Sequence, residues 1–445
     1  MAKLFGTDGV RGLANYDLTP ELAFGLGRAA GSLLRSPSQR SAMIIGKDSR
    51  LSGPMLEGAL TAGICSAGVD VHLAGVIPTP AIAYLTKSLG YCAGAVISAS
   101  HNPAPDNGIK FFNSQGFKLD DGLEEGIEKI ISDGLIGLAR PTGRELGRCI
   151  PLTDARDRYI RYLQSTLGCE LQGLKIIVDC ANGAASDIAP RLLSGLGAQV
   201  ISLHDLPDGL NINDNCGSTH PAALQEAVVK YGAPLGLAFD GDADRVIAVD
   251  ENGQLVDGDK ILIICGLALQ EKKELGNKIV VTVMSNLGLK QAFEKAGIKV
   301  YETSVGDRFV LEKMLETGTV LGGEQSGHII FSKYATTGDG MLTGLQLLRV
   351  LQQSKRKLSE LAQQMNTLPQ LLLNVKVQNK NGWDNNPEIL AAIAAGEQSL
   401  AGKGRMFVRA SGTEPLIRVM AEGPDSQELE RLAGQVAGVI AAELG

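Results

Sequence analysis

The sequence predicts an α/β protein of four domains, and three observations support this prediction. The chain has 445 residues, which is enough for three or four domains of about 100–150 residues each. Apolar runs typical of buried strands alternate with helix-like stretches, a pattern typical of α/β units with largely parallel sheets. Near the C-terminus the pattern changes to two short strands and one amphipathic helix, which indicates a smaller α+β domain. We expect domains at 1–150, 151–254, 255–370 and 371–445.

Strands are predicted where short apolar runs are followed by polar residues. In the first three domains these runs are Ala42–Gly46, Ala93–Ile97, Lys175–Val178, Leu235–Phe239, Val246–Val249 and Lys278–Val283. The last domain has two more, at Gly404–Val408 and Leu416–Ala421.

Helices are predicted between these strands from their capping residues and apolar spacing. Thr19-Pro20-Glu21 supplies an N-cap, a proline at the first helical position and a first-turn acid ahead of 22–34. The glycines 25, 27 and 31 of this helix follow no strand, so we interpret them as close helix packing and not as a dinucleotide loop. The other predicted helices are Pro221–Tyr231, Gly288–Ala296 and one that Asp425 and Ser426 begin.

The composition limits the class of protein. The formal net charge of −7 argues against a general binder of nucleic acids or anionic membranes, although a local basic pocket is compatible with it. The seven cysteines are widely spaced without a CxxC pair, which favours buried thiols in a reducing compartment. The first residues have no apolar signal core, and no run approaches the ~18 apolar residues of a membrane span. We expect a cytoplasmic protein.

Polar clusters follow several of the predicted strands. They are Lys47–Arg50, Ser98–Asn102 and Asp240–Arg245. In open α/β sheets, ligands bind outside the carboxyl ends of the strands. A single polar strand end is an ordinary turn, but several with this chemistry predict a shared active cleft.

Asp240, Asp242 and Asp244 alternate as D-x-D-x-D. Three carboxylates that converge on one point repel each other unless a cation lies between them, and oxygen-only ligands suit Mg²⁺. A calcium loop with Glu251 at its twelfth position is the alternative. Arg245 replaces the glycine that such a loop needs, and a strand is predicted directly afterwards. A solvated acidic turn remains the other alternative.

Ser100 lies in the run Ser98-Ala99-Ser100-His101-Asn102-Pro103. A lone serine here would be an ordinary turn residue, but its neighbours favour a role as a phosphate carrier. His101 offers a proton-handling or hydrogen-bonding group, and Lys110 offers a charge that can neutralise phosphate. Asn102-Pro103 and Asp106-Asn107-Gly108 predict a rigid turn.

Two further loops carry groups that suit a phosphosugar. The loop Gly322–His328 presents Glu324, Ser326 and His328, which suit hydrogen bonds to sugar hydroxyls, although a tight surface turn is the alternative. The segment Arg409–Pro415, followed by Arg418, combines two guanidiniums, two hydroxyls and glycine-exposed amides. This combination predicts a phosphate-binding nest.

These motifs, in this order, resemble those of the α-D-phosphohexomutase superfamily over essentially the whole chain. Its phosphoserine, metal, sugar and phosphate loops match S-A-S-H-N-P, D-G-D-A-D-R, G-E-Q-S-G-H and R-A-S-G-T-E-P. The runs Phe5–Gly12 and Asn211–Thr219, together with Gln325, are similar to the branch that acts on amino sugars. The resemblance implies three related mixed α/β domains and a smaller α+β domain around a central cleft.

The resemblance also implies a role for each matching residue. Ser100 would be phosphorylated, and one Mg²⁺ would be held by Asp240, Asp242, Asp244 and the serine phosphate. Arg11, His101, Lys110 and Arg245 would line the cleft near the transferring group. Glu324 and Ser326 would contact sugar hydroxyls, with His328 as a proton acceptor. The clamps on the non-reacting phosphate would be Arg409, Ser411, Gly412, Thr413 and Arg418.

The implied reaction interconverts glucosamine 6-phosphate and glucosamine 1-phosphate through a 1,6-bisphosphate and feeds UDP-N-acetylglucosamine synthesis. A mutase for mannose or glucose phosphates, a phosphatase, and a non-catalytic sugar-phosphate or calcium binder are the alternatives. The resemblance implies a homodimer with a small phosphosugar as substrate, and the composition predicts no nucleic-acid or membrane partner. Glucosamine or glucose 1,6-bisphosphate, a priming kinase or self-phosphorylation would supply the first phosphate.

Overall fold

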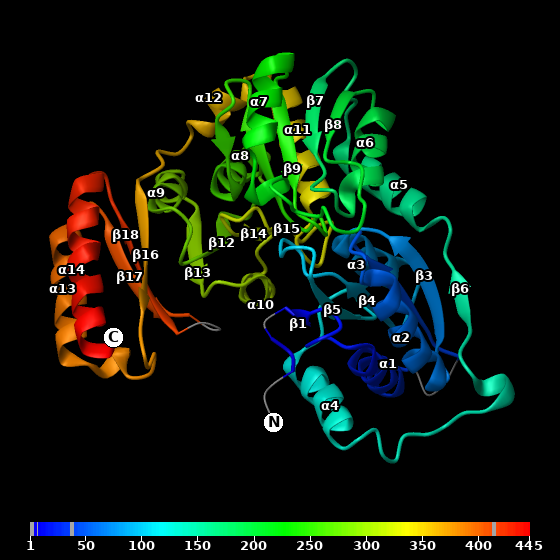
Figure 1. Cartoon of the computed structure of the whole chain (residues 1–445). Coiled ribbons are helices and arrows are strands. Elements are labelled where there is room, and N and C mark those ends of the chain that lie inside the picture. Colours follow the sequence, from blue (N-terminus) through cyan, green and yellow to red (C-terminus); the bar gives the residue numbers. More distant parts are fainter. Residues whose placement is uncertain (1–3, 7, 36–39, 412–414) are drawn as a thin grey trace. The chain divides into compact units, whose positions relative to one another are not determined.

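The computed structural model describes residues 4–6, 8–35, 40–411 and 415–445. The chain forms two compact units. The larger unit comprises Met1–Met284 and Ile298–Gln364, and the smaller one comprises Ser285–Gly297 and Met365–Gly445. Figure 1 labels the elements in chain order.

The first sheet of the larger unit has six strands in the order β1-β5-β4-β2-β3-β6. The pairs within β4, β2, β3 and β6 are parallel, whereas β5 is antiparallel to both of its neighbours. The strands are β1 (Val10–Leu13), β2 (Ala42–Lys47), β3 (Asp70–Val76), β4 (Ala93–Ile97), β5 (Asp106–Asn113) and β6 (Cys149–Pro151).

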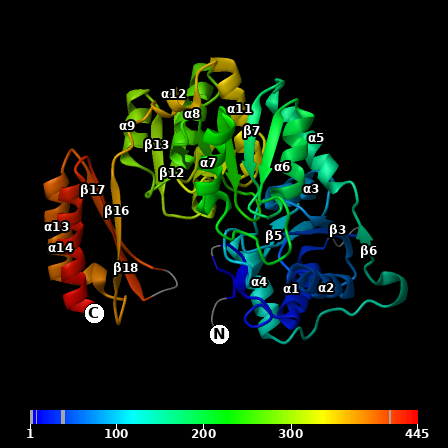
Figure 2. The same cartoon turned by 45° about the horizontal axis from the view of Figure 1, so that its top comes forward.

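Helices cover both faces of this sheet. Figures 1 and 2 show α1 (Pro20–Leu34) and α2 (Gly53–Ser66) side by side, and they form the main apolar core with α4 (Asp121–Ser132) and the sheet. Gly27 of α1 makes this approach possible, because a Cβ there would lie 2.3 Å from the carbonyl oxygen of Leu60. The predicted close packing is thus confirmed. On the opposite face, α3 (Thr79–Ser88) lies against Gly46 and Gly94.

The next two sheets share a strand arrangement with the first sheet. Their strand orders are β11-β10-β9-β7-β8 and β13-β12-β14-β15. In each of the three sheets, two parallel strands lie beside a third parallel strand, which continues into an antiparallel neighbour: β4–β5, β9–β10 and β14–β15. The strands are β7 (Lys175–Asp179), β8 (Gln199–Leu203), β9 (Leu235–Phe239), β10 (Val246–Asp250), β11 (Leu255–Val256), β12 (Lys278–Thr282), β13 (Lys299–Thr303), β14 (Leu321–Gly323) and β15 (Ile329–Phe331). This shared order confirms the prediction of three related α/β domains.

The helices of this part of the chain connect the parallel strands and link the sheets. They are α5 (Ala155–Leu167), α6 (Ala185–Gly195), α7 (Ala222–Tyr231), α8 (Gly258–Glu271), α10 (Asp307–Thr317), α11 (Gly340–Ser354) and α12 (Leu358–Ala362). Short 3₁₀ turns lie at η1 (Gly143–Glu145) and η2 (Gly217–Thr219).

The smaller unit is an α+β domain, as predicted. Its three-stranded antiparallel sheet has the order β16-β18-β17. Two helices, α13 and α14, lie on one face of this sheet in both Figure 1 and Figure 2. The elements are α9 (Leu287–Lys295), β16 (Gln370–Lys376), η3 (Trp383–Asn385), α13 (Pro387–Leu400), β17 (Arg405–Ala410), β18 (Leu416–Glu422) and α14 (Ser426–Leu444).

The predicted elements are found with shifts of one or two residues at their ends. Thr19 caps α1 by accepting a hydrogen bond from the amide of Leu22, and Asp425 caps α14. The predicted turn at 106–108 is wrong, because these residues begin β5 and pair with β1. Strand pairing outweighs the local turn preference of Asp, Asn and Gly there. The sheets of the three α/β domains are also mixed, not largely parallel, because each contains at least one antiparallel pair.

Candidate active site

Three of the predicted motifs occupy equivalent positions in the three α/β sheets. The loop with Ser100 joins β4 to β5, the loop 240–245 joins β9 to β10, and the loop 324–328 joins β14 to β15. Each loop therefore follows the carboxyl end of a strand, where α/β proteins bind their ligands. Gly322 and Gly323, expected in the third loop, belong to β14.

Ser100 and Asp240 are in direct contact although they come from different sheets. The Ser100 hydroxyl donates a hydrogen bond of 2.6 Å to Asp240 Oδ2, and the His101 Nδ1 atom lies 3.3 Å from the same hydroxyl oxygen. Ser100 has a φ of +53°, in the left-handed region that non-glycine residues seldom adopt. Burial, followed by the charges of Arg245 and Arg11, lowers the pKa of His101 to about 4, so its imidazole is neutral near pH 7.

The carboxylates of Asp240, Asp242 and Asp244 form a buried group. They offer one oxygen each within 4.8 Å of one another. Asp242 Oδ1 and Asp244 Oδ1 are buried and accept no hydrogen bond from the described residues. Burial and mutual repulsion raise the pKa of Asp240 and of Asp244. Orphaned oxygens and repelling carboxylates fit a hard divalent cation, which would satisfy both.

Two observations exclude the calcium-loop alternative. Glu251 accepts hydrogen bonds from the hydroxyl and the amide of Ser359, at 2.5 and 3.3 Å, and is not part of the carboxylate group. Arg245 is followed by β10, as predicted, and not by the rest of a twelve-residue loop.

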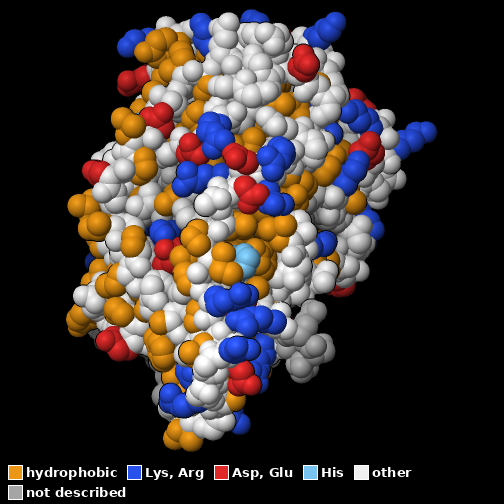
Figure 3. Space-filling view, turned by 90° about the vertical axis from the view of Figure 1, so that its right-hand side faces the viewer, with side chains coloured by type: hydrophobic (Ala, Val, Ile, Leu, Met, Phe, Trp, Pro, Cys, Tyr) orange, Lys and Arg blue, Asp and Glu red, His pale blue; other side chains and the backbone are white. Residues whose placement is uncertain are grey.

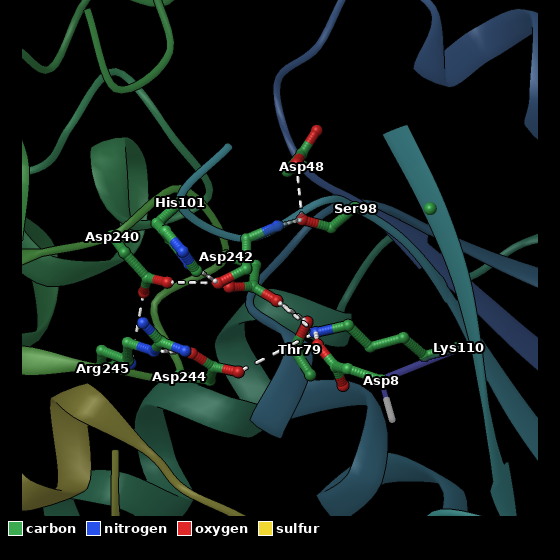
Figure 4. A network of polar contacts seen from close by, with 12 residues as sticks. Asp8, Asp48, Thr79, Ser98, His101, Lys110, Asp240, Asp242, Asp244 and Arg245 are labelled. Carbon is green, nitrogen blue, oxygen red and sulfur yellow. Dashed lines mark hydrogen bonds and ion pairs between the residues drawn. The ribbon is translucent and has the colours of Figure 1, made fainter. Parts of the chain in front are cut away.

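Lys110 lies beside the carboxylates and is 1% exposed. Its Nζ atom lies 3.2 Å from Asp242 Oδ2 and 2.9 Å from Asp8 Oδ2 (Figure 4). Burial opposes the charge of Asp242, but the Lys110 ammonium and a hydrogen bond from Thr79 hold the pKa of Asp242 at about 2. Asp8 also pairs with Arg11, which joins the predicted residue Arg11 to this network.

Two residues of the predicted sugar loop at 324–328, His328 and Glu324, lie beside this network. Backbone pairing joins Arg245 to His328, and His328 is 2% exposed with no hydrogen-bond partner for either ring nitrogen among the described residues. Glu324 is buried and accepts a hydrogen bond from the Gly306 amide. Burial opposes the charge of Arg245, but the carboxylates of Asp244 and Asp240, followed by that of Glu324, raise the pKa of Arg245. Ser326 is exposed.

The smaller unit contains the predicted phosphate loop. Arg409 of β17 and Arg418 of β18 are directly opposite each other in the strand register. Burial, and then the charge of Arg418, lowers the pKa of Arg409. Like charges placed opposite each other are destabilising, and an anion between them would remove that cost. Ser411 is buried and its carbonyl accepts a hydrogen bond from Lys380, whereas Gly412 and Thr413 lie outside the described residues.

Several residues of the network were not predicted as site residues. Thr79 donates a 2.6 Å hydrogen bond to Asp242 Oδ2. Asp8 lies in the quoted run Phe5–Gly12, which was a signal for it, whereas nothing in the sequence near Thr79 indicates its contact. Asp48 and Ser98 were noted only as members of polar clusters, yet they contact the Ser100 loop directly.

A second group of metal-ligand types was also not predicted. Asp179, His204 and Cys216 offer ligand atoms within 4.8 Å of one another. The oxygens of Asp179 already accept hydrogen bonds from the amides of Ala181 and Gly217, both at 3.0 Å. We interpret this group as support for the adjoining loops.

The fold and the chemistry of this site define the class of protein, namely phosphoryl-transfer enzymes that use a carboxylate-bound cation. Family models described as phosphoglucomutase/phosphomannomutase match the chain four times: domain I at 2–135, domain II at 157–253, domain III at 257–368 and the C-terminal domain at 372–439. The chain belongs to this family.

The chain is also similar over its full length to proteins named phosphoglucosamine mutase. The chain is 58% identical over 441 residues to a phosphoglucosamine mutase of Desulforamulus reducens, with 99% of each chain covered. It is 52% identical over 447 residues to the phosphoglucosamine mutase of Brevibacillus brevis, with 100% of each covered. Among solved structures, a phosphoglucomutase/phosphomannomutase family protein from Burkholderia thailandensis has a TM-score of 0.82 at 27% identity, covering 99% of this chain and 97% of its own.

A more distant structure shares the fold. N-acetylphosphoglucosamine mutase of Aspergillus fumigatus, solved in complex with GlcNAc-6P and magnesium, has a TM-score of 0.70 at 18% identity. It covers 99% of this chain and 95% of its own. Separately, none of the helices in the described ranges is long and apolar enough to cross a membrane.

Proposed function

We propose that this protein interconverts glucosamine 6-phosphate and glucosamine 1-phosphate and so feeds UDP-N-acetylglucosamine synthesis. The observation that carries the proposal is the 2.6 Å contact between the Ser100 hydroxyl and Asp240, at the edge of a buried carboxylate group. The amino sugar is supported by full-length relatives named phosphoglucosamine mutase at 52–58% identity.

The reaction proceeds through phosphorylated Ser100. The bond between phosphorus and the serine oxygen breaks as a bond forms to the 1-hydroxyl oxygen of glucosamine 6-phosphate, whose proton passes to a base. The glucosamine 1,6-bisphosphate then turns, and its 6-phosphoryl group returns to Ser100 while a proton returns to the 6-oxygen. Each half-reaction moves one phosphoryl group between Ser100 and a sugar oxygen, and one proton between that oxygen and a base. One set of residues can therefore serve both.

The residues divide this work according to their chemistry. Asp240, Asp242, Asp244 and an oxygen of the serine phosphate would hold one Mg²⁺, which when bound neutralises charge on the phosphoryl oxygens. Lys110 is a buried cation beside these carboxylates and would stabilise the transferring group. Neither ring nitrogen of His328 has a hydrogen-bond partner among the described residues, and Nε2 lies 3.6 Å from Asp307 Oδ2, which suits a proton acceptor for the sugar hydroxyl.

The remaining predicted residues bind and orient. Arg11 and Arg245 would hold the transferring phosphoryl group, and His101, as a neutral imidazole 3.3 Å from the serine oxygen, would hydrogen-bond it. Glu324 and Ser326 would contact sugar hydroxyls. The non-reacting phosphate would be held by Arg409, Ser411, Gly412, Thr413 and Arg418.

The net charge supports a small anionic substrate, bound at a local basic site, over a nucleic acid. The net charge is −7, and the face in Figure 3 has mixed Lys, Arg, Asp and Glu side chains above its centre and a local group of Lys and Arg side chains below it. Nucleic-acid binders instead present a continuous basic surface.

The proposal includes an oligomeric state, a location and a source for the first phosphate on Ser100. The homodimer rests on the family resemblance, and the cytoplasmic location rests on the widely spaced cysteines without a CxxC pair. The first phosphate would come from glucose or glucosamine 1,6-bisphosphate, or from a priming kinase.

A mutase that acts on mannose or glucose phosphates by the same mechanism is the second candidate, because the family models carry those names. An assay with Mg²⁺ and a bisphosphate primer separates the two. We expect turnover of glucosamine 6-phosphate to exceed that of glucose and mannose 6-phosphates. Faster turnover of either hexose phosphate would favour the second candidate. Release of inorganic phosphate in step with substrate loss would indicate a phosphatase.

A further inference from the structure

The backbone of Ser100 is held in an unfavourable conformation. Its φ of +53° lies in the left-handed region, which costs a non-glycine residue of the order of 1 kcal/mol or more. The hydroxyl can reach Asp240 from this conformation, and the surrounding structure must therefore hold it in place.

On the amide side, two side chains form a short relay. The Ser98 hydroxyl donates a hydrogen bond of 2.6 Å to Asp48 Oδ2 and accepts one of 2.9 Å from the Ser100 amide. All three residues are at most 1% exposed, so water does not compete for these bonds.

On the carbonyl side, two donors share the same two acceptors. Arg50 Nη2 donates to the carbonyl oxygens of Ser100 and Asn102, at 3.0 and 2.8 Å. Asn213 Nδ2 donates to the same two oxygens, at 2.9 and 3.0 Å. The Ser100 peptide is thus fixed on both sides of its Cα atom, from two different sheets.

Both donors are themselves fixed. Asp48 Oδ2 accepts a hydrogen bond of 2.8 Å from Arg50 Nε, so one carboxylate serves both sides of the clamp. The Asn213 amide donates to the carbonyl of Ala181 at 2.9 Å, and Asn213 has a φ of +58°. Gly241 of the metal loop passes close by, since a Cβ there would lie 2.5 Å from the Ser100 carbonyl oxygen.

We propose that Asn213 and Arg50 are positioning residues for phosphoryl transfer: they fix the backbone of Ser100 so that its hydroxyl is aimed at the carboxylate group. The inference rests on the proposed function, because it assigns to Arg50 and Asn213 a role in that reaction. Neither side chain contacts the Ser100 hydroxyl, so both act through the loop.

Asn213→Gly is the sharpest test of this proposal. Glycine tolerates the left-handed backbone, so the variant removes the amide donor without adding strain. Asn215→Gly is the matched control, because Asn215 lies in the same loop with a φ of +52° but is exposed. Asn213→Asp, which keeps the shape and replaces the donor by an acceptor, serves if the glycine variant does not fold.

The measurements are kcat and KM for glucosamine 6-phosphate, the single-turnover rate of Ser100 phosphorylation by glucose 1,6-bisphosphate, and the thermal midpoint. We expect Asn213→Gly to lower kcat and the phosphorylation rate by about ten- to a hundredfold, with KM within about twofold of the control. Asn215→Gly should match the unchanged protein.

Each alternative outcome is distinguishable. A kcat for Asn213→Gly within twofold of the control overturns the positioning role, and so does a higher KM at unchanged kcat. A fall in kcat that is fully explained by a lower folded fraction also overturns it. If the unchanged protein and the control both fail to turn over the substrate, the proposed function fails instead.

Discussion

Ser100 and Asp240 are 140 residues apart in the chain, yet their side chains meet at 2.6 Å. The two residues follow the corresponding strands β4 and β9 of two related sheets. This contact places a buried hydroxyl group against a carboxylate group with two oxygens that accept no hydrogen bond from the described residues, and the proposed chemistry rests on it.

Replacing Asp242 by Asn should weaken metal binding and turnover together. The change removes a carboxylate whose Oδ1 accepts no hydrogen bond from the described residues. We expect the Mg²⁺ concentration for half-maximal activity to rise at least about tenfold. Chelation should abolish the activity of the unchanged protein, and Mg²⁺ should restore it. Asp133→Asn, at an exposed position, is the control. Full activity in the presence of chelator would contradict the metal assignment.

Replacing Lys110 by Met should lower turnover without weakening metal binding. The Nζ atom lies 3.2 Å from Asp242, so its removal makes the potential at the carboxylates more negative and more attractive to a cation. We expect kcat to fall by about a hundredfold or more, with Mg²⁺ affinity unchanged or tighter. Titration of Mg²⁺ by calorimetry checks this. Weaker Mg²⁺ binding would mean that Lys110 organises the carboxylates instead.

Replacing Arg418 by Gln should raise KM more than it lowers kcat. Arg418 and Arg409 are opposite each other in the strand register, and we propose that together they hold the phosphate that is not transferred. Loss of one guanidinium should raise KM at least about tenfold. Arg431→Gln, on α14 where the Arg431 guanidinium donates a hydrogen bond to Gln435, is the matched control. Equal KM values for the two variants would remove Arg418 from substrate binding.

Asp70 predicts a pH dependence of stability that is separate from catalysis. Hydrogen bonds from Arg40 and Arg148 hold the pKa of Asp70 well below its usual range. Its stabilisation is therefore complete above the unfolded-state pKa of about 3.9 and is lost as pH falls towards the lower folded-state pKa. Asp70→Asn should lower the free energy of unfolding by about 1.5–3 kcal/mol at pH 7.

Urea unfolding of both proteins at several pH values checks the sign. The difference between Asp70→Asn and the unchanged protein should shrink as pH falls below about 4. A difference that grows in acid would contradict the assignment.

Much of this arrangement could be predicted from local sequence. Apolar runs such as Ala93–Ile97 predicted the strands, and the polar residues that follow these runs predicted the loops of the site. The contacts from Arg50 and Asn213 to the Ser100 loop could not be predicted, because they join segments 50 and 113 residues away from Ser100. The turn predicted at 106–108 was wrong. These residues have a local preference for turns, but pairing with β1 holds them in strand β5.

We propose above all that Ser100 carries the phosphoryl group. Identifying the residue that receives phosphate from glucose 1,6-bisphosphate tests this most directly. The protein is incubated with glucose 1,6-bisphosphate and Mg²⁺, digested, and analysed by mass spectrometry. We predict one phosphate, on Ser100, and loss of turnover by at least about a thousandfold in Ser100→Ala. Phosphate on another residue, or undiminished turnover in Ser100→Ala, would contradict the account.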